Sequence, residues 1–378
     1  MIINNVKLVL DDDVVHGSLE VQHGRILAFA ESQSRLPQAL DGEGGWLLPG
    51  LIELHTDNLD KFFTPRPKVD WPAHSAMSSH DAMMVASGIT TVLDAVAIGD
   101  VRDGGDRLEN LEKMVNAVEE TQKRGLNRAE HRLHLRCELP HHTTLPLFEK
   151  LIERESVSMV SLMDHSPGQR QYADRSKYRD YYQGKYHLTN DEMDRFEAEQ
   201  MALAATWSQP NRQTIAAMCR ARRIALASHD DATEAHVAES HQLGSVIAEF
   251  PTTLAAAQAS RQHGMHVLMG APNIVRGGSH SGNVAAHQLA SHGLLDILSS
   301  DYYPASLLDA AFRIADAEDN AFTLAQAIRL VSQHPAQALG LDDRGVIAEG
   351  KRADLVLAHR RGEHIHIDHV WRQGKRVF

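Results

Sequence analysis

A histidine and an aspartate stand two residues apart in the run 49–58, directly after a short apolar segment. Alternate side chains of an extended strand point to the same side, so His55 and Asp57 can converge on one object. An imidazole beside a carboxylate suits a divalent metal. The same pair also suits a buried His–Asp hydrogen bond at a strand end, and the rest of the chain has to decide between the two.

Four further polar residues stand where apolar, β-rich runs end: Glu138, His165, His229 and Asp301. Convergence at one place explains this placement, and histidine with carboxylate ligands favours zinc, manganese or iron over thiolate chemistry. A metal would lower the pKa of a bound water and make it a nucleophile. Asp301 would accept its proton and pass it to the leaving group. The predicted centre holds one or two divalent ions, zinc first, with Glu138 as bridge, on His55, Asp57, Glu138, His165, His229 and Asp301.

Eight β-rich runs that could position these residues alternate along the chain with helix-compatible segments. This alternation predicts a (β/α)8 barrel of the TIM type, in which the carboxyl ends of the strands carry the chemistry. The first run contains His55, and the others are 89–94, 133–138, 157–165, 224–229, 246–250, 266–270 and 295–301.

The two ends of the chain differ from this middle. Residues 1–48 and 344–378 contain alternating apolar runs broken by turns, without intervening helical segments. Such runs are typical of β-hairpins. We therefore predict a small β-sandwich domain formed from both termini, and a barrel over 49–343 that carries an insertion at about 166–221.

The insertion contains five of the seven tyrosines, interleaved with arginine and lysine. One interpretation is an amphipathic helical excursion that packs on the barrel or on a second subunit. The other is a lid that closes over an anionic substrate, with the basic side chains as its partners. The sequence leaves both open.

Composition excludes several classes of partner. The net charge of −12 opposes nonspecific binding to nucleic acid or to an anionic membrane. No apolar run approaches the roughly 20 residues needed to cross a bilayer. The first residues lack the pattern of a signal peptide, and two cysteines do not suggest a secreted scaffold. The expectation is a cytoplasmic protein.

Several of these features resemble the amidohydrolase superfamily: the Pro-Gly-Leu-Ile strand, the strand-end histidines, the aspartate on the last strand and the run 345–356. The resemblance implies a metal-dependent hydrolase and a homo-oligomer. Two departures stand out. The superfamily usually has His-x-His on its first strand, whereas this chain has His55-x-Asp57. His165 and His229 end strands four and five, not the usual five and six, so either the count misses a strand or the metal geometry differs.

Four ordered motifs, at 55–61, 163–169, 227–233 and 277–283, resemble the phosphonate-utilisation members of that superfamily more closely. This resemblance covers the whole chain. It implies a small-molecule ribosyl triphosphate substrate, α-D-ribose 1-methylphosphonate 5-triphosphate, which is hydrolysed to the 5-phosphate with release of pyrophosphate. It also implies the carbon–phosphorus lyase pathway of phosphonate catabolism and contact with other proteins of that pathway.

A triphosphate requires cations and backbone donors around it. Glycines in the loop after the seventh strand allow close backbone approach, although a flexible connection is the alternative interpretation. Lys61 follows the first strand, where a solvated surface position is equally compatible, and Tyr302 follows the last. His80 and Asp81 are expected to cap a helix first and to contact substrate second. The loop residues predicted to bind substrate are Arg276, Gly277, Gly278, Ser279, His280, Ser281 and Asn283.

Two other functions remain as alternatives. The first is C–N bond hydrolysis by a deaminase or deacylase, which is the ordinary chemistry of the superfamily. The basic, tyrosine-rich insertion and the Gly/Ser loop favour a phosphorylated substrate over a neutral base. The second alternative is a metal-free barrel that serves as a binding or scaffolding subunit. It requires loss of ligands, and every strand-end position here keeps a coordinating type of residue.

Overall fold

A computed structural model of the chain describes residues 1–99, 106–279 and 281–378. The chain forms two compact units. Unit 1 comprises 1–94, 116–132 and 269–378, and unit 2 comprises 95–115 and 133–268. The domain boundaries expected at 48/49 and 343/344 remain a prediction.

Eight parallel strands form a nearly closed barrel, sheet B, in the order β13-β12-β11-β10-β9-β8-β7-β6. A parallel bridge between Thr56 and Asp301 joins the end of the first strand to the segment after the last. The predicted count of eight strands is confirmed, so His165 follows the fourth strand and His229 ends the fifth. The strands are β6 (Leu51–Thr56), β7 (Ile89–Ile98), β8 (Glu130–Glu138), β9 (Val157–Met163), β10 (Ala225–His229), β11 (Ile247–Glu249), β12 (His266–Gly270) and β13 (Ile297–Ser299).

Helices separate the barrel strands, as the alternation predicts. Threonine N-caps begin α7 and α8, where Thr233 and Thr253 accept hydrogen bonds from the backbone N–H groups of His236 and Ala256. The helices outside the insertion are α1 (Asn58–Phe63), α2 (Ala73–Ala86), α3 (Asp106–Lys123), α4 (Thr144–Leu151), α7 (Glu234–Gln242), α8 (Leu254–Gln262), α9 (Ala271–Arg276), α10 (Ala286–Ser291), α11 (Ser306–Asp316), α12 (Leu324–Arg329) and α13 (Gln333–Ala338).

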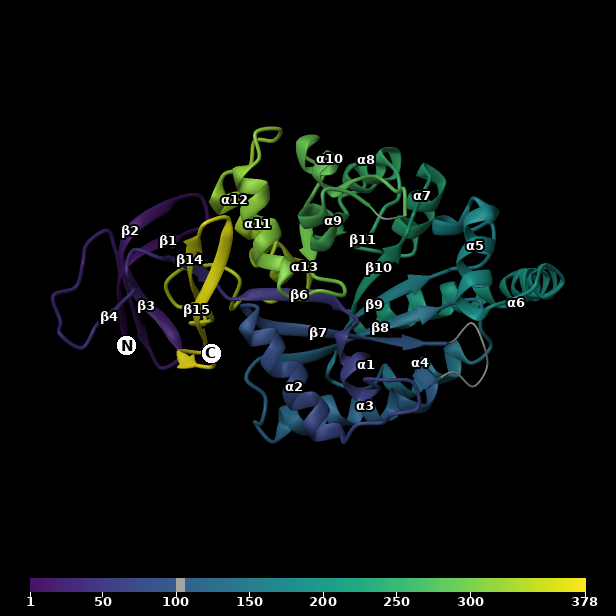
Figure 1. The fold of residues 1–378 in the computed structure, drawn as a ribbon, viewed down its shortest axis with the longest axis horizontal. Coiled ribbons are helices and arrows are strands. Elements are labelled where there is room, and N and C mark those ends of the chain that lie inside the picture. Colours follow the sequence, from purple (N-terminus) through teal and green to yellow (C-terminus); the bar gives the residue numbers. More distant parts are fainter. Residues whose placement is uncertain (100–105, 280) are drawn as a thin grey trace. The chain divides into compact units, whose positions relative to one another are not determined.

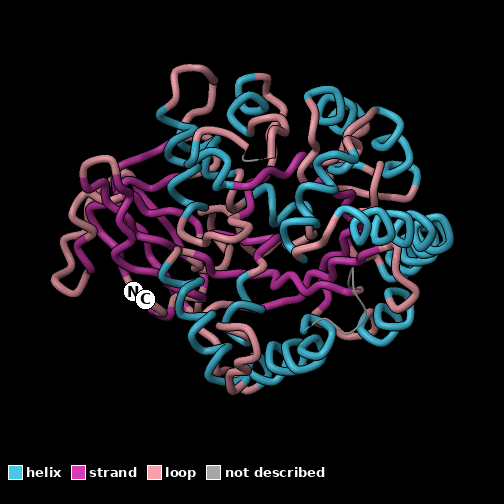
Figure 2. Tube along the Cα trace, turned by 45° about the vertical axis from the view of Figure 1, so that its right-hand side comes forward, coloured by secondary structure: helices cyan, strands magenta, loops and turns pink. Residues whose placement is uncertain are grey.

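The termini combine in a second, mixed sheet, sheet A, which belongs to unit 1. Figure 1 shows its N-terminal strands in purple beside β14 and β15 in yellow, and Figure 2 shows strands joined by loops. The strand order is β16-β15-β14-β5-β1-β2-β3, with β4 paired to β1. Its strands are β1 (Ile2–Val9), β2 (Val14–Gln22), β3 (Arg25–Ala30), β4 (Leu40–Asp41), β5 (Trp46–Pro49), β14 (Leu355–Arg361), β15 (His364–Arg372) and β16 (Lys375–Arg376).

A shared hydrophobic core explains why both termini are needed for sheet A. Strand β14 pairs with β5 in antiparallel register, with Leu357 opposite Leu47. The side chains of Leu8, Leu47 and Leu355 are fully buried in one core cluster together with Trp371. The apolar side chains on one face of the N-terminal strands are thus shielded from water by the C-terminal strands, and the reverse also holds.

The insertion folds as helices within unit 2: η1 (Arg170–Tyr172), α5 (Arg175–Tyr186) and α6 (Asn190–Arg222). Tyr178 and Tyr182 are buried against Phe196 of α6. Arg175 and Arg179 both form ion pairs with the buried carboxylate of Glu197, at 2.7 and 2.6 Å. These aromatic and basic residues therefore hold the insertion together, while its role as a lid or an interface remains a prediction.

In the described ranges, no helix combines the length and the apolar character that a membrane crossing requires. Cys137 and Cys219 are both buried and both free thiols.

A buried polar network fixes α2 in unit 1. Asp94 of β7 accepts hydrogen bonds from His80 Nε2 at 2.6 Å and from His131 Nδ1 at 2.7 Å. His131 Nε2 lies 3.0 Å from Asp81, which also accepts the backbone N–H of Ala129 at 2.9 Å. His80 and Asp81 lie inside α2, so the expectation that they cap a helix is wrong. The helix begins at Ala73, after its N-cap Pro72, and no proline or glycine interrupts it before His80.

The carboxylates of this network hold His131 as an imidazolium. Burial alone would lower the pKa of His131, but Asp94 and Asp81 outweigh burial and raise that pKa to about 9. Burial likewise works against ionised Asp94, yet His80 and His131 hold its pKa well below the usual range. The positive ring between two carboxylates thus stabilises the folded state.

The raised pKa of His131 predicts a pH-dependent contribution to stability. The contribution is complete below the ordinary pKa of 6.5 and is lost as pH rises through about 9. We expect His131→Gln to lower the free energy of unfolding by about 1–3 kcal/mol at pH 6, and the difference from the unmodified protein to shrink by pH 10. Urea unfolding at both pH values measures it.

The matched control is His263→Gln, because His263 is an exposed histidine. It is expected to leave the free energy of unfolding nearly unchanged at both pH values. A difference for His131→Gln that stays constant from pH 6 to pH 10 would show that no imidazolium is held in the network.

Candidate metal centres

Unit 1 brings three of the predicted metal ligands together: His55, Asp57 and Asp301. One ligand atom from each lies within 4.8 Å of the others. His55 is the penultimate residue of β6 and is 1% exposed, and its Nε2 lies 3.7 Å from Asp57 Oδ1. Asp301 follows β13 in a left-handed conformation, φ 53°. Its N–H donates to the His55 carbonyl at 3.1 Å, and its carbonyl accepts the Asp57 N–H at 3.3 Å. This backbone pairing places Asp301 beside His55 and Asp57.

Glu53, which the sequence analysis did not select, supports the same group. Its carboxylate accepts the backbone N–H of His55 at 2.7 Å and that of Ser300 at 2.6 Å. It is fully buried, and burial raises its pKa to about 7 although hydrogen bonds from Ser300 and His55 oppose the rise. The available signal was its position two residues before His55, on the same side of the strand.

Two predicted substrate residues also meet in unit 1. Lys61 Nζ lies 6.0 Å from the ring centre of Tyr302, within the range of a cation–π contact. Lys61 Nζ donates to Asn58 Oδ1 at 3.3 Å, and Asn58 Nδ2 donates to Thr56 Oγ1 at 2.9 Å. The lysine is thereby directed along the end of β6, next to the metal ligands His55 and Asp57 in sequence.

Unit 2 groups His165 and His229 with Asp230, a residue the sequence analysis did not select. Asp230 Oδ2 lies 3.5 Å from His165 Nε2 and 3.3 Å from His229 Nε2. One ligand atom from each of the three lies within 4.8 Å of the others. Asp230 is left-handed, φ 56°, which places its carboxylate beside the preceding histidine. The only signal in the sequence was its position directly after a strand-end ligand.

Glu138 lies on the opposite edge of the His165 ring, with Oε1 2.6 Å from Nδ1. Burial opposes charge on both groups, but each stabilises the charge of the other. The pKa of Glu138 falls to about 2, and that of His165, which also faces Asp230, rises to about 10. A divalent cation takes the place of such a proton when it binds. Bridging by Glu138 remains a prediction.

The predicted substrate loop follows α9 in unit 1. Arg276 ends the helix, and Gly277 is its C-cap with φ +81°, a conformation that favours glycine. Beyond Gly278, the hydroxyls of Ser279 and Ser281 lie 3.0 Å apart, and Asn283 Nδ2 donates to Ser281 Oγ at 3.3 Å. His280 lies outside the described residues. Phosphate binding by this loop remains a prediction.

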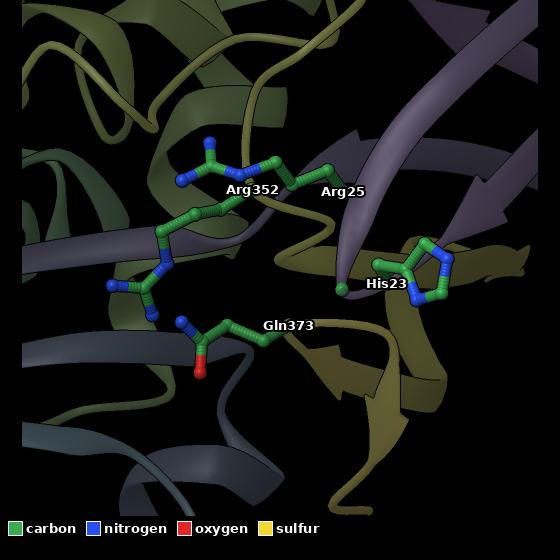
Figure 3. Close-up of a pocket in the computed structure, with 5 residues that line it drawn as sticks. His23, Arg25, Arg352 and Gln373 are labelled. Atoms are coloured by element: carbon green, nitrogen blue, oxygen red, sulfur yellow. The ribbon is translucent and has the colours of Figure 1, made fainter.

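A small pocket of about 380 Å³ lies elsewhere in unit 1 and contains none of the predicted ligands. Figure 3 shows the side chains of Arg25, Arg352 and Gln373 extending in the same direction from its lining. Arg352 is buried and forms ion pairs with Glu130 at 2.7 Å and Asp354 at 3.1 Å. Those ion pairs connect Arg352 with β8 and with the residue that precedes β14.

The donor sets in both units fit a divalent metal. Each combines imidazole nitrogen with carboxylate oxygen, which suits zinc, manganese or iron. Each also gathers acceptor atoms closely enough to require a cation or a proton among them. The predicted ligands thus fall into two described groups: His55, Asp57 and Asp301 in unit 1, and His165 and His229 in unit 2, with Glu138 against His165.

Comparisons with known proteins identify relatives of the whole chain. A family model described as "Amidohydrolase family" matches residues 84–378. A curated Escherichia coli (strain K12) protein, alpha-D-ribose 1-methylphosphonate 5-triphosphate diphosphatase, is 83% identical over 378 residues, 100% of each chain.

Two solved structures share the fold, and at their low sequence identities they show the fold alone. A 5-methylcytosine deaminase from Klebsiella pneumoniae has a TM-score of 0.65 at 15% identity, over 100% of this chain and 97% of that one. An N-acetyl-D-glucosamine-6-phosphate deacetylase from Mycobacterium smegmatis has a TM-score of 0.65 at 16% identity, over 100% of both chains.

The family model covers well over half of the chain, and the curated relative matches it from end to end. The barrel and its strand-end histidines and carboxylates agree with that assignment. This chain therefore belongs to the amidohydrolase family.

Proposed function

We propose that the chain is a metal-dependent hydrolase that cleaves α-D-ribose 1-methylphosphonate 5-triphosphate to the 5-phosphate and pyrophosphate. The observation that carries this proposal is the 83% identity, over the full length of both chains, to the relative with that name. The two groups of candidate metal ligands support it, because phosphoanhydride hydrolysis depends on concentrated positive charge.

Each ligand group is proposed to hold one metal ion. We propose that His55, Asp57 and Asp301 hold an ion in unit 1, and that His165 and His229 with Asp230 hold one in unit 2. When bound, a divalent metal supplies positive charge that acidifies water and offsets charge on phosphate oxygens. Glu53 fixes the backbone of the unit 1 group through its two N–H contacts.

Asp301 is the proposed proton acceptor. In the reaction, the oxygen of a water molecule bonds to a phosphorus of the α–β bridge, and the bond from that phosphorus to the bridging oxygen breaks. Asp301 takes the proton from the water and returns it to the former bridging oxygen on the leaving group, so that the products are the 5-phosphate and pyrophosphate. Its left-handed backbone and its bridge to Thr56 hold the carboxylate at the end of the barrel strands.

The triphosphate is proposed to bind through cations and small donors. Lys61, which lies over the ring of Tyr302 and donates to Asn58, offers an ammonium just after the end of β6. The loop from Arg276 to Asn283 offers hydroxyl, amide and glycine backbone donors. These contacts would offset the charge that develops as the α–β phosphoanhydride bond breaks.

Several finer properties remain part of the proposal. We propose zinc as the metal, a cytoplasmic homo-oligomer, and contact with other proteins of phosphonate catabolism. Nucleic acid and membranes are not expected partners, since the net charge of −12 disfavours both.

Replacement of the proton acceptor tests the mechanism. We expect Asp301→Asn to lower turnover about 10²–10⁴-fold, because the amide cannot accept the proton from water. Pyrophosphate release from the ribosyl triphosphate measures turnover. The midpoint of thermal unfolding is expected to stay close to that of the unmodified protein. Metal content is measured alongside turnover, because Asp301 is also a proposed ligand of the unit 1 ion.

Asp309→Asn is the matched control, since Asp309 forms an ion pair with Arg313 on the surface of α11 in the same unit. It is expected to retain full turnover. Near-native turnover by Asp301→Asn would rule out the proton-transfer role, and absence of pyrophosphate release by the metal-loaded unmodified protein would refute the proposed substrate.

Because two ligand groups are proposed, a substitution in one group is expected to remove only the ion of that group. We expect about two equivalents of metal per chain, and we expect His229→Ala and Asp57→Ala each to lose about one of them while the other remains. Elemental analysis after gel filtration measures the content. His263→Ala, which removes an exposed histidine of unit 2, is expected to lose none. Loss of all metal from either ligand variant would contradict independent groups.

A further inference from the structure

A chain of buried polar side chains lies behind His229 in unit 2. It connects four neighbouring barrel strands, β8 to β11, through His134, Ser161, Glu249 and His229. Glu249 Oε2 lies 2.9 Å from His229 Nδ1 and accepts the Ser161 hydroxyl at 2.8 Å. His134 Nε2 forms a further hydrogen bond with Ser161 Oγ. His134 and Ser161 are 0% exposed, and Glu249 is 1% exposed.

With Glu249 ionised, every bond in the chain has one direction. An ionised carboxylate only accepts, so Ser161 donates its hydroxyl hydrogen to Glu249 and receives one from His134 Nε2. For the same reason His229 donates from Nδ1. A neutral His229 then carries its lone pair on Nε2, the atom that lies 3.3 Å from Asp230 Oδ2. Two acceptors at that distance need a proton or a metal cation between them.

The end of β11 restrains both His229 and Asp230. The ring of Phe250 packs against the imidazole with centroids 5.5 Å apart and planes at 83°. The backbone carbonyl of Glu249 accepts the N–H of Asp230 at 3.0 Å. The same residue thus orients the imidazole through its side chain and the neighbouring carboxylate through its backbone.

We propose that Glu249 is a positioning residue for the unit 2 metal group. It holds His229 in the Nδ1–H tautomer, with Nε2 directed toward Asp230, and Ser161 and His134 keep the Glu249 carboxylate in place. A carboxylate on the far nitrogen of a histidine raises its basicity and fixes its ring as a metal ligand. This inference rests on the proposed metal-dependent function. It assigns Glu249 no contact with substrate.

The test compares metal affinity with the stability of the metal-free protein. Glu249→Gln preserves shape but removes the charge that fixes the tautomer. We expect cobalt(II) affinity, measured by competition with a chelator, to fall about 10–100-fold and the cobalt absorption spectrum to change. Ser161→Ala leaves the Glu249–His229 bond in place and is expected to weaken affinity less.

The matched control is Glu197→Gln, a buried carboxylate of the same unit whose partners are Arg175 and Arg179. It is expected to lower the unfolding midpoint of the metal-free protein without a change in metal affinity. Unchanged affinity and spectrum in both Glu249→Gln and Ser161→Ala would overturn the positioning role, and the Ser161 variant alone decides if Glu249→Gln does not fold. Failure of the unmodified protein to bind metal would instead refute the proposed function.

Discussion

Glu53 accepts the backbone N–H groups of His55 and Ser300 and so ties the first barrel strand to the end of the last. Burial of a carboxylate at 0% exposure costs free energy unless hydrogen bonds satisfy it. Glu53 therefore favours the one register of β6 and the end of β13 in which both N–H groups reach its carboxylate. The bridge between Thr56 and Asp301 continues this pairing outward. The spacing of His55, Asp57 and Asp301 follows from that register.

Two carboxylates serve the same purpose in unit 2, the half-buried Glu138 and the buried Glu249, where they orient side chains instead of backbone. Glu138 and Glu249 lie on the Nδ1 edges of His165 and His229, and both Nε2 atoms lie near Asp230. Each carboxylate gains hydrogen bonds that offset part of its desolvation. A ligand group arranged before metal arrives loses less conformational entropy when metal binds.

The barrel could be predicted from sequence because its signals are local. Apolar runs that end in His55, Glu138 and His229 mark strand ends, and all eight predicted strands are present. The supporting residues could not be found in the same way, because their partners are distant: Ser161 and Glu249 are 88 positions apart, and Glu53 and Ser300 are 247. His80 looked like a helix cap in isolation, but the tertiary network of Asp94 and His131 buries it inside α2. The tyrosines of the insertion showed its helical character, yet packing around Phe196, not composition, decides which of them are buried.

The most direct measurement is phosphorus NMR of the protein after removal of metal and again after reloading with zinc. Ribose 1-methylphosphonate 5-triphosphate and an ordinary nucleoside triphosphate are the two substrates. Pyrophosphate from the ribosyl compound only, and only after reloading, is the expected result. Equal release from both compounds, or release that persists without metal, would contradict a selective, metal-dependent hydrolase.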